Sequence, residues 1–288
     1  MSKERDQDLI KSRVSQHYDT YPFPGKLNAY GPWTELAPNL LTSLGLMPDA
    51  LRGARVLDAG CGTGEYARSF AQLGAQVTAI DLSREALTKA RSIDEELGLP
   101  DVEYLQADLL NLPSLGTFDF IFSLGVLHHT ANPLRGFHNL VTKLRPGGYL
   151  TVGLYSSISR FHILVMRQIL NLISLKNQEC AIDLAQHWFR PFLHLFIGAE
   201  NVDDRARIAD LLANVHEHPI SLGTVLRWFK ADGFHIVGCA PSCDVADYPL
   251  LARLSPQPDS RLTYFAIQLR WLLWNADYYI VTGRASSW

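Results

Sequence analysis

A glycine-rich loop that begins directly after an acidic residue is the strongest chemical signal in this sequence. Residues 56–65 read Val-Leu-Asp-Ala-Gly-Cys-Gly-Thr-Gly-Glu, where an apolar stretch ends and a helical pattern begins. Glycines let the backbone approach a ligand without a Cβ clash. Because open α/β folds bind ligands at the carboxyl ends of their strands, the loop predicts a ligand site.

The spacing of the loop and the charge before it indicate the kind of ligand. Gly60, Gly62 and Gly64 form the pattern Gly-x-Gly-x-Gly, which differs from the dinucleotide pattern Gly-x-Gly-x-x-Gly. No Gly-Lys-Ser/Thr follows, which excludes a P-loop. Asp58 would repel a pyrophosphate at the helix N-terminus and would favour a cation, such as a sulfonium that carries an α-amino group. Cys61 is interpreted as a small buried side chain rather than a nucleophile.

Two further acidic residues follow the next two predicted strands. Asp81 stands about 20 residues after the loop, where a carboxylate accepts hydrogen bonds from ribose hydroxyls. Asp108 follows the third strand, where it would accept a hydrogen bond from the exocyclic amine of an adenine. The alternative for Asp81 is a helix-capping or surface role, and for Asp108 a place at a helix start.

Two adjacent histidines, His128 and His129, follow the fourth predicted strand and are the candidate catalytic residues. A histidine, with its pKa of about 6.5, suits the removal of a proton from an oxygen or ammonium acceptor. The alternative is that the pair shapes a cofactor pocket or caps a helix. Tyr155 and Arg160 follow the fifth strand as candidate substrate-binding residues. Arg160 would hold a carboxylate through two hydrogen bonds, with a structural salt bridge as the alternative.

Alternating apolar runs and helical patterns position these residues. Strands are predicted at 55–58, 76–80, 102–106, 118–123, 149–154, 234–239 and 278–282, with helices at 64–73, from 83, at 132–144 and at 221–231. This alternation is typical of an α/β fold with a parallel sheet covered by helices on both faces.

The chain divides into four predicted parts. Residues 1–50 form an N-terminal helical and aromatic lid segment, with a polar helix through about His17, and residues 51–155 form the core with the ligand site. Residues 156–215, here called the cap, read as helical throughout and interrupt the alternation. Residues 216–288 complete the core sheet. The cap is expected to cover a ligand site, and packing or dimerisation is the alternative.

Taken together, these motifs resemble the class I, Rossmann-like S-adenosylmethionine-dependent methyltransferases. The resemblance covers roughly residues 50–155 and continues loosely to the final strand; it rests on Asp58–Gly64, Asp81, Asp108, Phe118–Ser123 and Leu144–Gly148. It implies a seven-stranded, mostly parallel sheet whose last strand is antiparallel. The long segment 241–276 departs from the short connection that is usual between the last two strands.

The resemblance also implies S-adenosyl-L-methionine as the cofactor. Gly60 and Gly62 would face its methionine part, Asp81 its ribose, and Asp108 with Leu109 its adenine. The aromatic stretch at 18–24 resembles one that precedes the core of some bacterial methyltransferases, with a hydrophobic anchor as the alternative interpretation. The predicted cofactor-binding residues are Tyr18, Tyr21, Asp58, Gly60, Cys61, Gly62, Gly64, Asp81, Leu82, Ala107, Asp108, Leu109, Ser123 and Leu124.

Composition limits the partners. The net charge of -3 argues against a general electrostatic grip on nucleic acid. The four cysteines have no zinc spacing, and the pair His216 and His218 lacks a third ligand, so no metal is expected. The polar N-terminus and the lack of a long apolar run predict a soluble, cytoplasmic protein with no transmembrane segment. Trp271 and Trp274 make the apolar second half a candidate homodimer face.

The preferred hypothesis is methyl transfer to an oxygen or nitrogen atom of a small or medium, partly apolar metabolite, bound between the sheet edge and the cap. The alternatives are methylation of a macromolecule, protein or tRNA, and a non-catalytic Rossmann-like binding protein. A dehydrogenase is disfavoured by the loop spacing and by Asp58.

Overall fold

The computed structural model describes most of the chain. The described residues are 2–21, 33–99, 101–175, 177–191, 193, 203–244, 247, 260–273, 276 and 278–286. The aromatic and proline-rich stretch at 22–25 and the predicted dimer-face residue Trp274 lie outside them.

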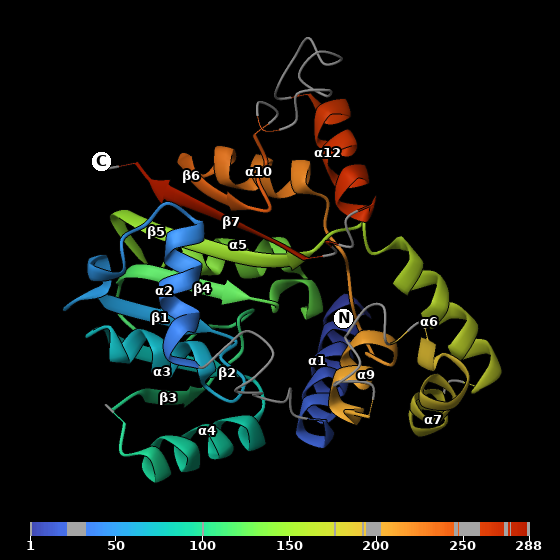
Figure 1. The fold of residues 1–288 in the computed structure, drawn as a ribbon. Coiled ribbons are helices and arrows are strands. Elements are labelled where there is room, and N and C mark those ends of the chain that lie inside the picture. Colours follow the sequence, from blue (N-terminus) through green and yellow to red (C-terminus); the bar gives the residue numbers. More distant parts are fainter. Residues whose placement is uncertain are drawn as a thin grey trace.

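Seven strands form a single twisted sheet (Figure 1). The strands are β1 (Arg55–Ala59), β2 (Gln76–Asp81), β3 (Glu103–Gln106), β4 (Phe118–Leu124), β5 (Leu144–Tyr155), β6 (Phe234–Ala240) and β7 (Tyr278–Ala285). Their order is β3-β2-β1-β4-β5-β7-β6, and β7 runs antiparallel to both of its neighbours. The predicted seven-stranded sheet with an antiparallel last strand is therefore confirmed.

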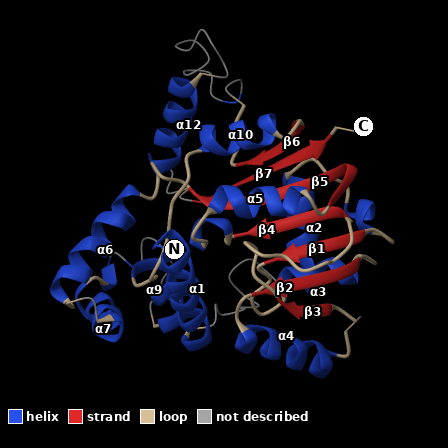
Figure 2. Ribbon diagram, turned by 180° about the vertical axis from the view of Figure 1, so that it is seen from behind, coloured by secondary structure: helices blue, strands red, loops and turns tan. Residues whose placement is uncertain are grey.

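Helices cover both faces of this sheet (Figures 1 and 2). On one face, α2 (Trp33–Ser43), α3 (Glu65–Gln72) and α4 (Arg84–Leu97) pack in one buried cluster with β-strand residues such as Val56. On the other, α5 (Pro133–Val141), α10 (Leu222–Ala231) and α12 (Arg261–Leu273) pack in a second cluster with Leu57. The side chains of Val56 and Leu57 lie on opposite faces of the sheet, because successive side chains of a strand point to alternate faces.

Local residues set the helix boundaries near the site. Ser83 accepts a hydrogen bond from the Ala86 amide and so caps α4, and Gly98, in the left-handed region, ends it. Asn132 caps α5 in the same way, with Pro133 in its first turn. These caps start both helices at the carboxyl edge of the sheet.

Two predicted boundaries were wrong. The helix predicted to reach Leu144 ends at Val141, and β5 begins at Leu144 instead of Tyr149. Leu144 pairs with Phe118 of β4, and the ladder then shifts register before resuming at Tyr149. Gly147, at φ +73°, lies within this irregular part, so the predicted turn falls inside the strand rather than before it.

The cap contains α6 (Phe161–Ile173), α7 (Gln178–Trp188) and α9 (Arg205–Leu212), which share a third buried cluster around Ile163, Ile182 and Ile208. Helix α1 (Ser2–Thr20) lies beside α9, between the sheet and the cap (Figures 1 and 2). It extends three residues beyond His17, so it includes Tyr18.

One side chain predicted for a dimer face is part of the core instead. Trp271 is fully buried and packs on Tyr279, with ring centroids 5.6 Å apart. Among the described helices, none is both long and apolar enough to cross a lipid bilayer.

Candidate functional site

The glycine-rich loop connects β1 to α3 and touches the end of β2. Gly60 donates its amide to the carbonyl oxygen of Ile80 at 2.7 Å. Its φ is +90°, and a Cβ atom at this position would lie 2.2 Å from Cγ2 of Val126, so only glycine fits. Gly62 donates its amide to Oδ2 of Asp81 at 2.8 Å. The loop and Asp81 therefore form one unit.

Gly64 and Cys61 complete the loop. Gly64, at φ +81°, is the N-cap residue of α3. Burial raises the pKa of the Cys61 thiol well above its ordinary value, and the charges of Asp81 and Asp58 add to this effect. The thiol is therefore protonated at neutral pH, which argues against a nucleophilic role.

Asp58 is a buried carboxylate with an unused oxygen. Its side chain is 3% exposed, and Oδ2 has no hydrogen-bond partner among the described residues. Burial and then the charge of Asp81 raise the pKa of Asp58 to about 7, although a hydrogen bond from the Ala67 backbone opposes the shift. A buried carboxylate in this state is suited to bind a cationic group that restores its charged form.

Asp81 keeps its orientation through the backbone. Oδ1 accepts a hydrogen bond from the Ser83 amide at 2.8 Å, and Oδ2 accepts the one from Gly62. Burial raises the pKa of Asp81, while these backbone hydrogen bonds lower it. Each oxygen retains a lone pair for a further donor. The two carboxylates thus fit the donors of S-adenosylmethionine: Asp58 would accept from its amino group, and Asp81 from its ribose hydroxyls.

A hollow of about 750 Å³ lies between α1 and the loops after β2 and β3, lined by Leu82, Gln106 and polar residues of α1. Asp108 stands close to this region, and its Oδ2 pairs with Nζ of Lys11 at 2.9 Å. The amide of Ala107 donates to the carbonyl oxygen of Asp81 at 2.9 Å. The side chain of Leu109 is buried in the core cluster. The predicted cofactor residues Leu82, Ala107 and Asp108 thus lie at one edge of the sheet, with Lys11 opposite Asp108.

The end of β4 leads into the histidine pair. The Ser123 hydroxyl is buried without a hydrogen-bond partner in the described part of the chain, and Leu124 is half-buried beside it. His128 and His129 lie in the short helix η2 (Leu127–His129), with ring centroids 4.2 Å apart. Burial lowers the pKa of His128 well below its ordinary value, and neither ring nitrogen has a described hydrogen-bond partner. His128 is therefore neutral.

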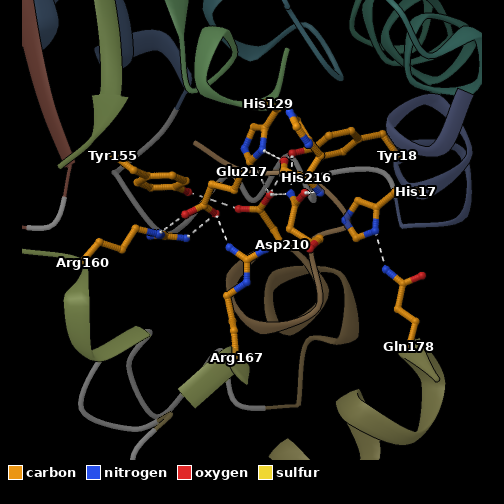
Figure 3. A network of polar contacts seen from close by, with 11 residues as sticks. His17, Tyr18, His129, Tyr155, Arg160, Arg167, Gln178, Asp210, His216 and Glu217 are labelled. Atoms are coloured by element: carbon orange, nitrogen blue, oxygen red, sulfur yellow. Dashed lines mark hydrogen bonds and ion pairs between the residues drawn. The ribbon is translucent and has the colours of Figure 1, made fainter. Parts of the chain in front are cut away.

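His129 lies in a defined polar environment (Figure 3). Nδ1 is 2.9 Å from the carbonyl oxygen of His216. Because a carbonyl oxygen only accepts, Nδ1 must carry the proton, which leaves Nε2 unprotonated in the neutral ring. Burial lowers the pKa of His129, although the charges of Asp210 and Glu217 oppose this effect. The neutral ring thus presents Nε2 as a base.

Tyr155 and Arg160 lie together at the end of β5. The Arg160 guanidinium lies 3.3 Å from the Tyr155 ring centroid and is almost fully buried. Its Nε pairs with Oε1 of Glu217 at 2.9 Å, and Arg167 pairs with Oε2 of the same carboxylate, also at 2.9 Å. Arg160 thus binds the carboxylate of Glu217 in the same chain. This is the structural salt bridge that was the alternative to binding a substrate carboxylate.

Tyr18 and Tyr21 take different places. The Tyr18 hydroxyl donates to Oδ1 of Asp210 at 2.9 Å, and its ring lies 5.9 Å from that of His129. Tyr21 packs on the buried cluster of the cap. Tyr18 thus lies beside the histidine pair, and Tyr21 links α1 to the cap.

Sequence reasoning did not identify Asp210, Glu217 or Lys11. Asp210 lies in α9 outside every motif, and Lys11 is one of many charges on a polar helix. Glu217 follows α9 in the chain. The one available signal is the position of Glu217 between His216 and His218, a pair that the sequence analysis weighs only as metal ligands and sets aside. Within the described residues, no three potential metal ligands come together.

Comparison with known proteins extends this description. A family model for a methyltransferase domain matches residues 57–152. The uncharacterized protein syc1184_c of Synechococcus sp. is 36% identical over 252 residues, which cover 80% of this chain and 60% of that protein. The ubiquinone biosynthesis O-methyltransferase of Xanthomonas campestris is 40% identical over 107 residues, which cover 35% of this chain and 43% of that enzyme.

Among solved structures, PKMT2 from Rickettsia typhi in complex with AdoHcy has a TM-score of 0.65 at 18% identity, covering 92% of this chain and 55% of that one. The matches thus span 60% or less of the length of these three proteins. The family match and the strand order agree with each other. Residues 57–152 carry a methyltransferase domain, and the seven-stranded sheet with its antiparallel last strand is the Rossmann-like fold that the resemblance in the sequence implies.

Proposed function

We propose that this protein transfers a methyl group from S-adenosyl-L-methionine to an oxygen or nitrogen atom of a small or medium, partly apolar metabolite. The observation that carries the proposal is the buried carboxylate of Asp58, which has an unpartnered oxygen beside the glycine-rich loop. Asp58 would hold the amino group of the cofactor, Asp81 its ribose, and the loop around Gly60 would pass close to its methionine part.

S-adenosylmethionine supplies a methyl group that is already activated by its sulfonium. The protein's tasks are therefore to align the acceptor and to exclude water. Ser123, His128, His129 and Tyr155 line the edge of the sheet where the acceptor would lie, and three of these are buried. The proton of a hydroxyl or ammonium acceptor would pass to Nε2 of His129. His216 supports this role, because its carbonyl oxygen fixes the ring tautomer.

The acceptor class rests on the cap. Helices α1 and α9 lie at the edge of the sheet (Figure 1), and the side chains of His128 and His129 are buried. This favours a metabolite over a macromolecule. The similarity to the ubiquinone biosynthesis enzyme covers 35% of the chain, so it supports the methyl-transfer chemistry more than the choice of acceptor.

The localisation and the oligomeric state of the protein are also proposals. We expect the protein to act in the cytoplasm, and to form a homodimer through an exposed apolar face of α6 rather than through Trp271. Phe161, Val165, Ile169 and Leu172 are exposed at helical spacing along α6. Light scattering on the purified protein tests the dimer.

Calorimetric titration tests the cofactor. We expect micromolar binding of S-adenosylmethionine and no binding of NAD. Asp81→Ala should weaken binding at least about tenfold, since a charged acceptor of ribose hydroxyls is lost. Asp49→Ala is the matched control, because the Asp49 side chain is 89% exposed and Asp49 precedes the start of β1, whereas the loop follows the end of that strand. Binding of neither ligand would favour a non-catalytic binding protein.

Acceptor profiling then tests the reaction. The protein is incubated with methyl-labelled S-adenosylmethionine and, separately, with a small-molecule extract, total protein and tRNA. Label in the small-molecule fraction is expected. Label only in protein or tRNA would support methylation of a macromolecule instead.

A further inference from the structure

The Asp210 carboxylate, on cap helix α9, lies at the centre of the buried polar network (Figure 3). Oδ1 accepts hydrogen bonds from the Tyr18 hydroxyl at 2.9 Å and from Nδ2 of Asn214 at 3.2 Å. Oδ2 accepts one from the Tyr155 hydroxyl at 3.2 Å. One carboxylate therefore joins α1, β5 and the cap, and Tyr18 lies 192 positions from it in the sequence.

Asp210 is charged despite its burial. Burial raises the pKa of Asp210, but His129 in its protonated form, the Arg160 guanidinium and the hydrogen bond from Tyr18 together hold that pKa below its ordinary value. Tyr18 stays a donor, because burial and the charge of Asp210 raise the pKa of its hydroxyl well above the ordinary value. The network thus contains a permanent anion held by neutral donors.

This anion faces the basic nitrogen of His129. Nε2 lies 4.0 Å from Oδ1 of Asp210. The other charged groups that act on the ring are Glu217, which also favours its protonated form, and Arg160, which disfavours it. Arg160 is already paired with Glu217. Among the charged groups that act on His129, Asp210 has the largest effect on its pKa.

Neutral rings complete the surroundings of His129. His128 packs against it from η2, Tyr155 from β5 and Tyr18 from α1. His17, also on α1, acts on the network electrostatically and has its pKa lowered to about 4 by burial, so it is neutral as well. None of these groups supplies a second counter-charge.

We propose that Asp210 is the positioning residue of the active site: it holds Tyr18 and Tyr155 in place and supplies the counter-charge for protonated His129. The inference rests on the proposed function, in which His129 takes the proton of the acceptor. The methyltransferase core provides the histidine, and the cap provides the carboxylate that makes the histidine an adequate base. The packing of the cap and α1 against the core thus completes the proton-accepting pair.

The titration of His129 tests this role without a known acceptor. Protein with ¹³C-labelled histidine is titrated by NMR, with His129 assigned by loss of its signal in His129→Gln. A full charge at 4.0 Å has a strong effect at a partly buried site. Asp210→Asn should therefore lower the proton affinity of His129 at least about tenfold, which is one pH unit in its midpoint. Asp210→Glu, which keeps a carboxylate, should restore most of the shift.

Asp203→Asn is the matched control, because Asp203 is on the cap but its side chain is 74% exposed and pairs with Arg190. It should leave the His129 midpoint unchanged. An unchanged midpoint in folded Asp210→Asn would overturn the proposal, since a purely structural carboxylate would not affect the titration selectively.

A second measurement uses only the unsubstituted protein, in case Asp210→Asn does not fold. The ¹³C chemical shift of the Asp210 carboxyl should change at the pH where His129 titrates. A chemical shift that stays constant through this pH would contradict the inference. Calorimetry with S-adenosylhomocysteine on the same samples separates the two proposals. Absence of binding to the unsubstituted protein would count against the proposed function, whereas the His129 titration reports on Asp210 alone.

Discussion

Nε of Arg160 lies 2.9 Å from Oε1 of Glu217, and both side chains are buried. A second arginine, Arg167, approaches Oε2 of Glu217 at the same distance. One carboxylate therefore pairs with two guanidinium groups in the wall of the candidate site, which leaves one positive charge in excess. This arrangement explains why a cationic residue expected to bind a substrate carboxylate is held by the chain itself.

The first prediction concerns this ion-pair group. Glu217→Gln leaves two arginines without their anion, and it should lower the free energy of unfolding by about 3–5 kcal/mol. Arg160→Met should cost less, because Arg167 still neutralises Glu217. Urea denaturation measures both. Glu179→Gln is the control, since its pair with Arg205 is exposed and should contribute less than about 1 kcal/mol. Equal losses in all three variants would contradict this account.

The second prediction concerns the pH dependence of cofactor binding. The pKa of Asp58 is raised to about 7, so the carboxylate is mostly protonated below that pH and mostly charged above it. Because a cationic amino group binds the charged form, affinity for S-adenosylmethionine should rise between pH 5.5 and 7.5, by up to about tenfold per pH unit. Calorimetry measures the slope. Asp58→Asn should bind S-adenosylmethionine weakly, and its affinity should no longer depend on pH. A pH slope that persists in this variant would rule out Asp58 as the source of the slope.

The third prediction applies the same shift to stability. A folded pKa above the unfolded value means that the folded state is favoured while Asp58 is protonated, and that this contribution is lost as pH rises through about 7. At pH 8, ionised Asp58 should cost about 4 kcal/mol, since one pKa unit corresponds to about 1.4 kcal/mol. Asp58→Asn should therefore be more stable than the unsubstituted protein at pH 8, with the difference shrinking towards pH 5. Thermal unfolding at the two pH values provides the comparison.

The fourth prediction concerns the close packing of the loop. Gly60→Ala places a Cβ atom 2.2 Å from Val126, so the loop must move and cofactor affinity should fall more than about tenfold. Gly53→Ala is the matched control: Gly53 has φ +72° but no heavy atom within 4 Å of a new Cβ, so only the backbone penalty of about 1–2 kcal/mol applies. Combining Gly60→Ala with Val126→Ala should recover part of the affinity. If the two alanine variants bind equally well, the contact with Val126 is not what requires glycine.

Much of the fold was predictable from the sequence because it depends on local signals. The strands β1 to β4 and the caps Ser83 and Asn132 follow from apolar runs and from residues close in the chain. The seven-stranded sheet with its antiparallel last strand was predicted from the resemblance to class I methyltransferases, which rests on the same motifs. The start of β5 was missed, because Leu144 joins the strand by pairing with Phe118, a contact that helical periodicity does not reveal.

The positions of the loop, Asp58, Asp81 and the histidine pair at the carboxyl ends of strands are predictable from the residues close to them in the chain. Their charge states and their neighbours, in contrast, depend on the folded arrangement of the whole chain. The raised pKa of Asp58 arises from burial and from Asp81, which belongs to a neighbouring strand. Asp210 reaches His129 and Tyr18 from a helix in another part of the chain. Burial and long-range pairing depend on how the cap and α1 pack on the sheet, and no local pattern of residue types encodes that packing.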